Sequence, residues 1–245
     1  MKPLLILTLL LSTLTFADCV GAKEPRPSNV QESRAQDVNE FLNRWKDQRH
    51  RNLFESATWT LTHDYSDSKR VDEVLKSVQS YFEALGKYEK GDHSSLDQMG
   101  GLKAFKDKLS GWLSDDDQAV RAFAAVMLGI SGDKSYVPQL ANLLKERKYK
   151  DSDLLHYDRG RAAMALGLVG AQEYIPNLVT LLDSSNEYDR SGAAYGLGFL
   201  KVKDQAMAIA KLLNDEDENV REAAKESLEM MGAAEFIKDK KAGKP

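Results

Sequence analysis

The sequence predicts an all-α fold: an α-α superhelix, or solenoid of stacked helices, with an N-terminal helical hairpin as its cap. Three observations support this class. An arginine recurs with a leucine seven residues later in alanine-rich surroundings, an apolar doublet precedes each arginine, and residues 36–90 carry apolar side chains at helical spacing. The arginine and leucine pairs are Arg121/Leu128, Arg159/Leu166, Arg190/Leu197 and Arg221/Leu228.

The repeat has a nearly fixed period. The arginines are spaced 38, 31 and 31 residues apart, and the leucines that close the doublets (Leu113, Leu144, Leu182 and Leu213) are spaced 31, 38 and 31 apart. A period in this range indicates stacked supersecondary units. We therefore expect four two-helix repeats over residues 101–232, with a seven-residue insertion within the segment 146–157.

The second helix of a repeat has predicted start and stop signals. Asp117, Asn186 and Asp217 each stand four residues before a repeat arginine, where their side chains can cap the helix and face its positive end. Glycine follows the leucine by four residues in three repeats, and Lys201 takes that place in the other. Alanine pairs inside these helices predict close helix packing.

These motifs resemble the HEAT repeat. Asp117-Gln-Ala-Val120-Arg121 with Ala124-Ala125, echoed by Asp217-Glu-Asn-Val220-Arg221 with Ala223-Ala224, is closest to the short bacterial type that also occurs in phycobilisome lyases. The resemblance implies second helices that line a concave binding surface, and arginines that bridge to acidic turn residues of adjacent repeats. Repeat two departs from the pattern, with Leu155 at the cap position and Asp158 where valine is expected.

The N-terminus is typical of a secretory signal over residues 1–22. Lys2 supplies the charged region, and the apolar run from Leu4 to Ala17 is too short to span a bilayer. Cleavage after Ala17 or after Ala22 fits, and the second leaves a polar, extended start. Lipidation at Cys19 is a third option, and membrane association is expected only in that case. The predicted location is the periplasm or the exterior.

The regions outside the repeats are expected to differ from them. Residues 23–35 are interpreted as a disordered linker and residues 233–245 as a flexible tail. Residues 36–90 are predicted to form the helical cap, which lacks the arginine and alanine pattern. A loop from Gly91 to Gly101 follows it.

The composition argues against a nucleic-acid partner, so the expected partner is a protein. The net charge is −4, and no basic stripe is present to neutralise nucleic-acid phosphates. The adjacent pairs His63-Asp64 and Asp92-His93, and His156 with its neighbouring aspartates, lack the spacing of a catalytic triad or metal site. We expect no catalytic residue, no metal and no cofactor.

The candidate binding surface lies on the second helices, opposite their arginine and leucine positions. Projection at 100° per residue places an apolar row there. Because exposed aromatic and methionine side chains often mark partner surfaces, we expect this row to bind a protein. Its members are Phe123, Val126, Arg161, Met164 and Tyr195. The repeat arginines are interpreted as structural, and the insertion at 146–157 is a second candidate surface.

The functional hypothesis is a non-catalytic scaffold or adaptor of the bacterial cell envelope. Two alternatives stay open: a chromophore-binding enzyme like the phycobilin lyases, which the export signal disfavours, and a lipid-anchored structural component of the envelope. The sequence leaves undecided the partner, the cleavage site, the oligomeric state and the biological process.

Overall fold

The computed structural model describes residues 29–63, 68–145 and 157–237. Within these ranges the regular structure is helical and contains no strand. The chain divides into two compact units, residues 1–112 and residues 113–245. The predicted signal peptide with Cys19, and the insertion up to residue 156, lie outside the described residues.

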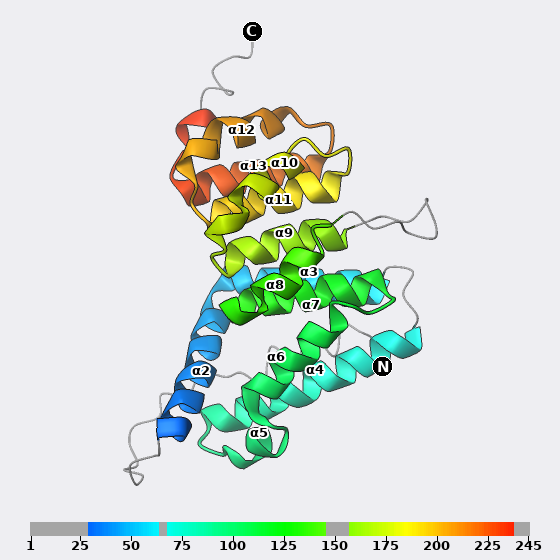
Figure 1. Cartoon of the computed structure of the whole chain (residues 1–245), viewed down its shortest axis with the longest axis vertical. Coiled ribbons are helices and arrows are strands. Elements are labelled where there is room, and N and C mark those ends of the chain that lie inside the picture. Colours follow the sequence, from blue (N-terminus) through cyan, green and yellow to red (C-terminus); the bar gives the residue numbers. More distant parts are fainter. Residues whose placement is uncertain (1–28, 64–67, 146–156, 238–245) are drawn as a thin grey trace. The chain divides into compact units, whose positions relative to one another are not determined.

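The described part of the first unit, residues 29–63 and 68–112, contains five helices (Figure 1). They are α2 (Asn29–Lys46), α3 (Gln48–His63), α4 (Ser68–Glu89), α5 (Ser94–Gln98) and α6 (Gly101–Trp112). Two differences from expectation follow. Helix α2 begins at Asn29, inside the segment predicted to be a linker, and α5 interrupts the predicted loop between Gly91 and Gly101. The helix α6, expected to open the first repeat, belongs to this unit.

Aromatic rings form the core of the first unit. The Trp45 ring lies 4.6 Å from the Phe82 ring and 4.9 Å from the Phe54 ring, and Phe54 and Phe82 are fully buried. Ring pairs at these distances add edge and face contacts to the burial of large apolar surfaces. A partly buried ion pair between Lys106 Nζ and Asp37 Oδ1, at 2.6 Å, joins α6 to α2.

The second unit is a stack of helical hairpins. A shorter helix, α8 (Val137–Asn142), α10 (Ile175–Leu181) or α12 (Ala206–Lys211), precedes a longer one, α9 (Asp158–Leu168), α11 (Glu187–Phe199) or α13 (Glu218–Met231). Helix α7 (Gln118–Ser131) is the second helix of the first repeat. Short 3-10 turns, Lys134–Tyr136, Gln172–Tyr174 and Lys203–Gln205, lead into the shorter helices, and a fourth, Leu212–Asn214, follows α12.

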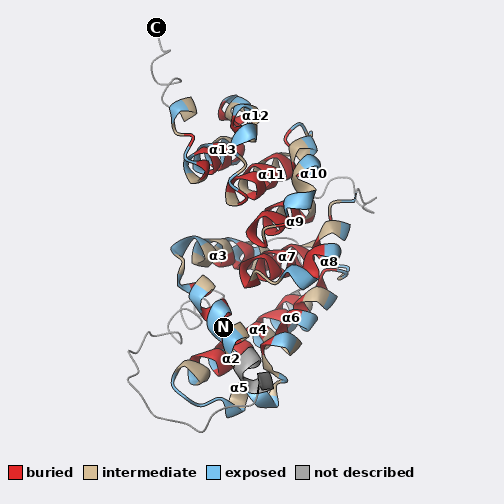
Figure 2. Ribbon diagram, turned by 60° about the vertical axis from the view of Figure 1, so that its left-hand side comes forward, coloured by how far each residue is buried: buried red, intermediate tan, exposed pale blue. Residues whose placement is uncertain are grey.

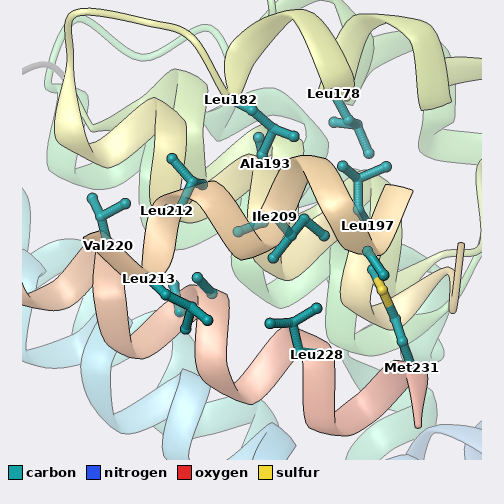
Figure 3. Close-up of a cluster of buried hydrophobic side chains, with 14 of the residues drawn as sticks. Leu178, Leu182, Ala193, Leu197, Ile209, Leu212, Leu213, Val220, Leu228 and Met231 are labelled. Atoms are coloured by element: carbon teal, nitrogen blue, oxygen red, sulfur yellow. The ribbon is translucent and has the colours of Figure 1, made fainter. Parts of the chain in front are cut away.

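The core of the stack lies between the shorter and the longer helices (Figure 3). Leu178 of α10, Leu197 of α11, Ile209 of α12 and Leu228 of α13 are all completely buried there. Each longer helix therefore has one face toward the shorter helices and an opposite face that is available for other contacts. This all-α arrangement is a HEAT-like solenoid.

Helices α9 and α11 pack backbone against backbone. A Cβ atom on Gly192 would lie 2.0 Å from the Gly160 carbonyl oxygen, and one on Gly160 would lie 2.0 Å from the Tyr188 carbonyl oxygen. Two helical turns further along α9, a Cβ atom on Gly167 would lie 2.3 Å from the Gly196 carbonyl oxygen. Only glycine permits so close an approach. The alanine pairs indicated close packing, but these glycines bring the two helices closest together.

The ends of the longer helices follow the predicted stop signal. Gly132, Gly170 and Gly232 have φ of 70°, 76° and 70°, in the left-handed region that glycine enters without strain. Lys201 stands at the same place in its repeat and has φ of 55°. It is the only non-glycine residue with positive φ in the described ranges. The backbone of this turn is therefore kept even where the sequence lacks glycine.

Helix α13 has a charged side where α11 has a close-packed one. The positions that hold Ala194 and Gly198 in α11 correspond to Lys225 and Glu229 in α13, both exposed. In α11 this side faces α13, as the contact of Gly198 with Ser227 shows. Part of the segment predicted to be a flexible tail packs on this unit, because Ala233 is buried and Phe236 lies against the core.

Candidate protein-binding surface

The repeat arginines bind the turn inside their own repeat. Arg121 Nη1 donates to the carbonyl oxygens of Asp115 and Asp116, at 2.7 and 2.9 Å. Arg190 and Arg221 make the same pair of hydrogen bonds to the turns before α11 and α13. These arginines therefore satisfy carbonyl groups that would otherwise lack a partner in a partly buried turn.

Three of the four arginines also reach the next repeat. Arg121 Nε donates to Asp158 Oδ2 at 2.8 Å, and Arg190 Nη2 donates to Asp215 Oδ1 at 2.7 Å. Arg159 pairs with Asp189, whose side chain is 1% exposed. An ion pair thus joins each repeat to the following one, and we call these three pairs the ladder.

The ladder corrects the expectation about the acidic partners. Asp215 lies in a turn, as expected, but Asp158 and Asp189 lie at the start of a second helix, directly before the next arginine. The position before the repeat arginine holds valine in the first and fourth repeats but Asp158 and Asp189 in the second and third. Both aspartates accept a hydrogen bond from the arginine of the preceding repeat. These two departures from the repeat pattern therefore provide the first two acidic partners of the ladder.

Side-chain caps hold the starts of the second helices. Asp117 Oδ1 accepts from the Ala119 amide at 2.7 Å, and Asp217 Oδ1 accepts from the Val220 amide at 3.0 Å. Asn186 Oδ1 accepts from the Tyr188 and Asp189 amides. Each cap satisfies helix amides that have no partner within the helix.

The Arg190–Asp215 pair, which is one rung of the ladder, makes the free energy of unfolding depend on pH. Hydrogen bonds from Arg190 hold the pKa of the Asp215 carboxyl below its ordinary value. A lowered pKa means that the stabilisation is present above the ordinary pKa of about 4 and is lost as pH falls through the lower, folded-state pKa. We expect Asp215→Asn to lower the free energy of unfolding by about 2 kcal/mol at neutral pH. Urea unfolding of both proteins across pH should show this difference shrink in acid. A difference that is the same at every pH would contradict the role of the charge.

Most of the predicted exposed row is buried. Phe123, Val126 and Met164 are 1%, 0% and 1% exposed, so the expectation that they face solvent is wrong. The projection treated each helix as isolated. Helix α7, however, is apolar on every side and buried from Ala119 to Ser131, and α9 lies between α7 and α11 with its residues from Ala162 to Leu168 buried (Figure 2).

Tyr195 and Arg161 are the two members of the row that remain partly exposed. The Tyr195 hydroxyl donates to Glu226 Oε2 at 3.1 Å, and desolvation together with the Glu226 charge raises the pKa of Tyr195. Desolvation lowers the pKa of Arg161, which lies close to the hydroxyls of Tyr157, Tyr188 and Tyr195. Partner binding by Tyr195 and Arg161 stays a prediction.

Three further side chains belong to the same face, and the sequence reasoning missed them. Tyr188 and Phe199 of α11 and Met230 of α13 are partly exposed, and the Phe199 ring stacks on Tyr195 at 6.5 Å. Tyr188 lies two helical turns before Tyr195 and Phe199 one turn after it, so extending the projection along α11 would have found both. Met230 occupies the position of Phe199 in the next repeat, 31 residues later. We call Arg161, Tyr188, Tyr195, Phe199, Glu226 and Met230 the inner face.

The histidines of the two adjacent pairs that the structure describes stack on neighbouring aromatic rings. His63 stacks on the exposed Trp59 at 4.8 Å, and its partner in sequence, Asp64, lies outside the described residues. His93 stacks on Tyr88, while Asp92 accepts hydrogen bonds from Ser94. His156 also lies outside the described residues. In residues 29–63, 68–145 and 157–237 no three potential ligands gather to hold a metal ion.

Among the helices of residues 29–63, 68–145 and 157–237, none is long and apolar enough to cross a bilayer.

Comparison with known families agrees with the architecture of the second unit. A family model described as HEAT repeats matches residues 150–229, which contain α9 to α13 apart from the last residues of α13. A search of curated proteins finds no match. HEAT repeats generally mediate protein–protein interaction. The family match, the ladder of arginine and aspartate pairs and the stacked hairpins together show that this chain contains HEAT repeats, with the match over residues 150–229.

Proposed function

We propose that this protein is a non-catalytic scaffold of the bacterial cell envelope, and that it binds a partner protein along the inner face. The observation that carries the proposal is the group of aromatic and methionine side chains on the side of α11 and α13 opposite the core. Tyr188, Tyr195, Phe199 and Met230 are each only partly buried. These residue types are enriched in protein interfaces and in their energetic centres.

The neighbouring helices support a fixed, semi-rigid surface. The close contact of α9 with α11 and the Tyr195–Glu226 hydrogen bond hold the side chains of three repeats in one arrangement. A surface that is ordered before binding loses less conformational entropy on association. The inner face is therefore suited to recognise a partner without enclosing it in a pocket.

The location is the second part of the proposal. Support comes from the N-terminal sequence, with its charged start and its short apolar run. The mass of the mature N-terminus, measured on protein from the envelope fraction, distinguishes cleavage after Ala17 or Ala22 from lipidation at Cys19. An intact N-terminus on all of the cellular protein would contradict export.

Site-specific photocrosslinking tests the binding surface. A photoreactive phenylalanine analogue in place of Phe199 keeps the size of the side chain, and we expect it to form one discrete adduct in the native envelope fraction. The matched control is the same analogue in place of Met207, which is 69% exposed on α12, one of the shorter helices. Adducts from position 207 and none from position 199 would place the binding surface on the other side of the solenoid. No adduct from either would contradict a scaffold role for these repeats.

A further inference from the structure

The end of the inner face carries negative charge that no described residue neutralises. Four glutamates of α13 are exposed, and none of them forms an ion pair with any residue of the described ranges. They are Glu218, Glu222, Glu226 and Glu229. In contrast, the ladder aspartates are all paired with arginines. Two basic residues, Arg221 and Lys225, lie between the first and last of these glutamates, and Arg221 donates hydrogen bonds to the carbonyl oxygens of Asp215 and Glu216.

This charge borders apolar surface directly. Glu226 accepts the hydrogen bond from Tyr195, whose ring stacks on Phe199, and Met230 follows Glu226 by one helical turn. The carboxylate row therefore lies along one edge of an aromatic and methionine surface. A side chain that fits both parts needs an aliphatic stem and a positive end, which is the chemistry of lysine and arginine. The faces of tyrosine and phenylalanine rings also attract such cations.

The positive charge of the inner face lies in another repeat. Arg161 is on α9, whereas the glutamates are on α13, two repeats further along the chain. The charge of the inner face therefore changes along the solenoid, from positive at α9 to negative at α13. Such a surface repels partners that carry like charges at the facing positions. It also fixes the register of a partner whose charges are complementary to it.

We propose that the part of the inner face formed by α11 and α13 binds a basic segment of a partner protein, in which lysine or arginine side chains alternate with apolar ones. This inference rests on the proposed scaffold function and adds the chemistry of its partner. The cationic groups contact the α13 carboxylates, chiefly Glu222 and Glu226. The apolar side chains contact Tyr195, Phe199 and Met230.

The test uses the full mature protein and a synthetic peptide that forms a helix with lysine on one side and leucine on the other. Isothermal titration at low and near-physiological ionic strength measures the affinity. We expect binding that weakens with salt, because exposed charges are screened. A second peptide with glutamate in place of every lysine should not bind, and a third with serine in place of every leucine should bind more weakly.

Matched variants separate this site from general attraction to an acidic protein. Glu222→Gln with Glu226→Gln should weaken peptide binding about tenfold, since two charge contacts are lost. Glu83→Gln with Glu173→Gln changes the net charge equally at exposed sites elsewhere and should leave the affinity within about twofold of wild type. Arg161→Gln, on the same face, should not weaken binding.

The outcomes distinguish this inference from the function on which it rests. Equal weakening by the two glutamate pairs, or no binding of the lysine and leucine peptide, would overturn the inference. If the crosslink from position 199 still captures a partner, the scaffold function stands, and sequencing the crosslinked segment shows its charge. A captured segment without lysine or arginine would also overturn the inference.

Discussion

Gly192→Ala should destabilise the second unit by about 2 to 3 kcal/mol net, near the upper end of the range for overpacked cores. The new Cβ would lie 2.0 Å from the Gly160 carbonyl oxygen and 2.5 Å from its carbonyl carbon. Both are backbone atoms, so α9 and α11 must separate. The better helix propensity of alanine offsets only about 1 kcal/mol of this cost. Urea unfolding followed by circular dichroism measures the loss.

A second glycine supplies the matched control. Gly111 of α6 has nothing within 4 Å of an added Cβ, so Gly111→Ala is the same chemical change without the collision. We expect it to be neutral or to stabilise by up to about 1 kcal/mol. If Gly192→Ala behaved like Gly111→Ala, the two helices would not be in backbone contact. Separation of α9 from α11 would also move Tyr195 away from Arg161. Gly192→Ala should therefore lower the yield of the photocrosslinked adduct formed from position 199.

Asp158→Ala should lower the free energy of unfolding by about 3 to 5 kcal/mol, because it removes the carboxylate of a buried ion pair. The Arg121 side chain is 5% exposed and that of Asp158 is 1% exposed. Removing the carboxylate leaves the Arg121 guanidinium with neutral carbonyl oxygens as its partners in the described turn. The free energy of unfolding, from denaturant titration, measures the effect.

The control removes an aspartate that has no part in the ladder. Asp204 is exposed in the turn before α12, and Asp204→Ala should change stability by no more than about 0.5 kcal/mol. The double variant Arg121→Met with Asp158→Leu tests the interpretation further. Since it removes both charges and keeps apolar volume, it should recover much of the loss. If the double variant were as unstable as Asp158→Ala alone, the loss would come from packing and not from the unpaired charge.

The ladder also explains how stability is shared along the repeats. Each rung connects one second helix to the next, through Asp158, Asp189 and Asp215 in turn. Stability in such arrays is approximately a sum of repeat terms and nearest-neighbour terms. Loss of one rung should therefore weaken one interface between repeats and leave the others, so that unfolding begins at the altered interface.

The sequence by itself determined the fold class, the register of the repeats and the caps of the second helices. These features depend on local spacing: an arginine, a leucine seven residues later, and Asp117, Asn186 or Asp217 four residues before the arginine. Helix periodicity and amide capping involve residues within about two turns of each other. A single chain therefore displays them without reference to its fold.

Only the tertiary structure decided which side chains are exposed and how the ladder is closed. Phe123 and Met164 occupy projected outward positions yet are buried, because exposure depends on every neighbouring helix. Asp158 looks like an irregularity until Arg121, 37 residues earlier, is found beside it. The approach of α9 to α11 is likewise a property of two helices together. Contacts between residues far apart in the chain have no local signal, and these contacts determine the surface that is left for a partner.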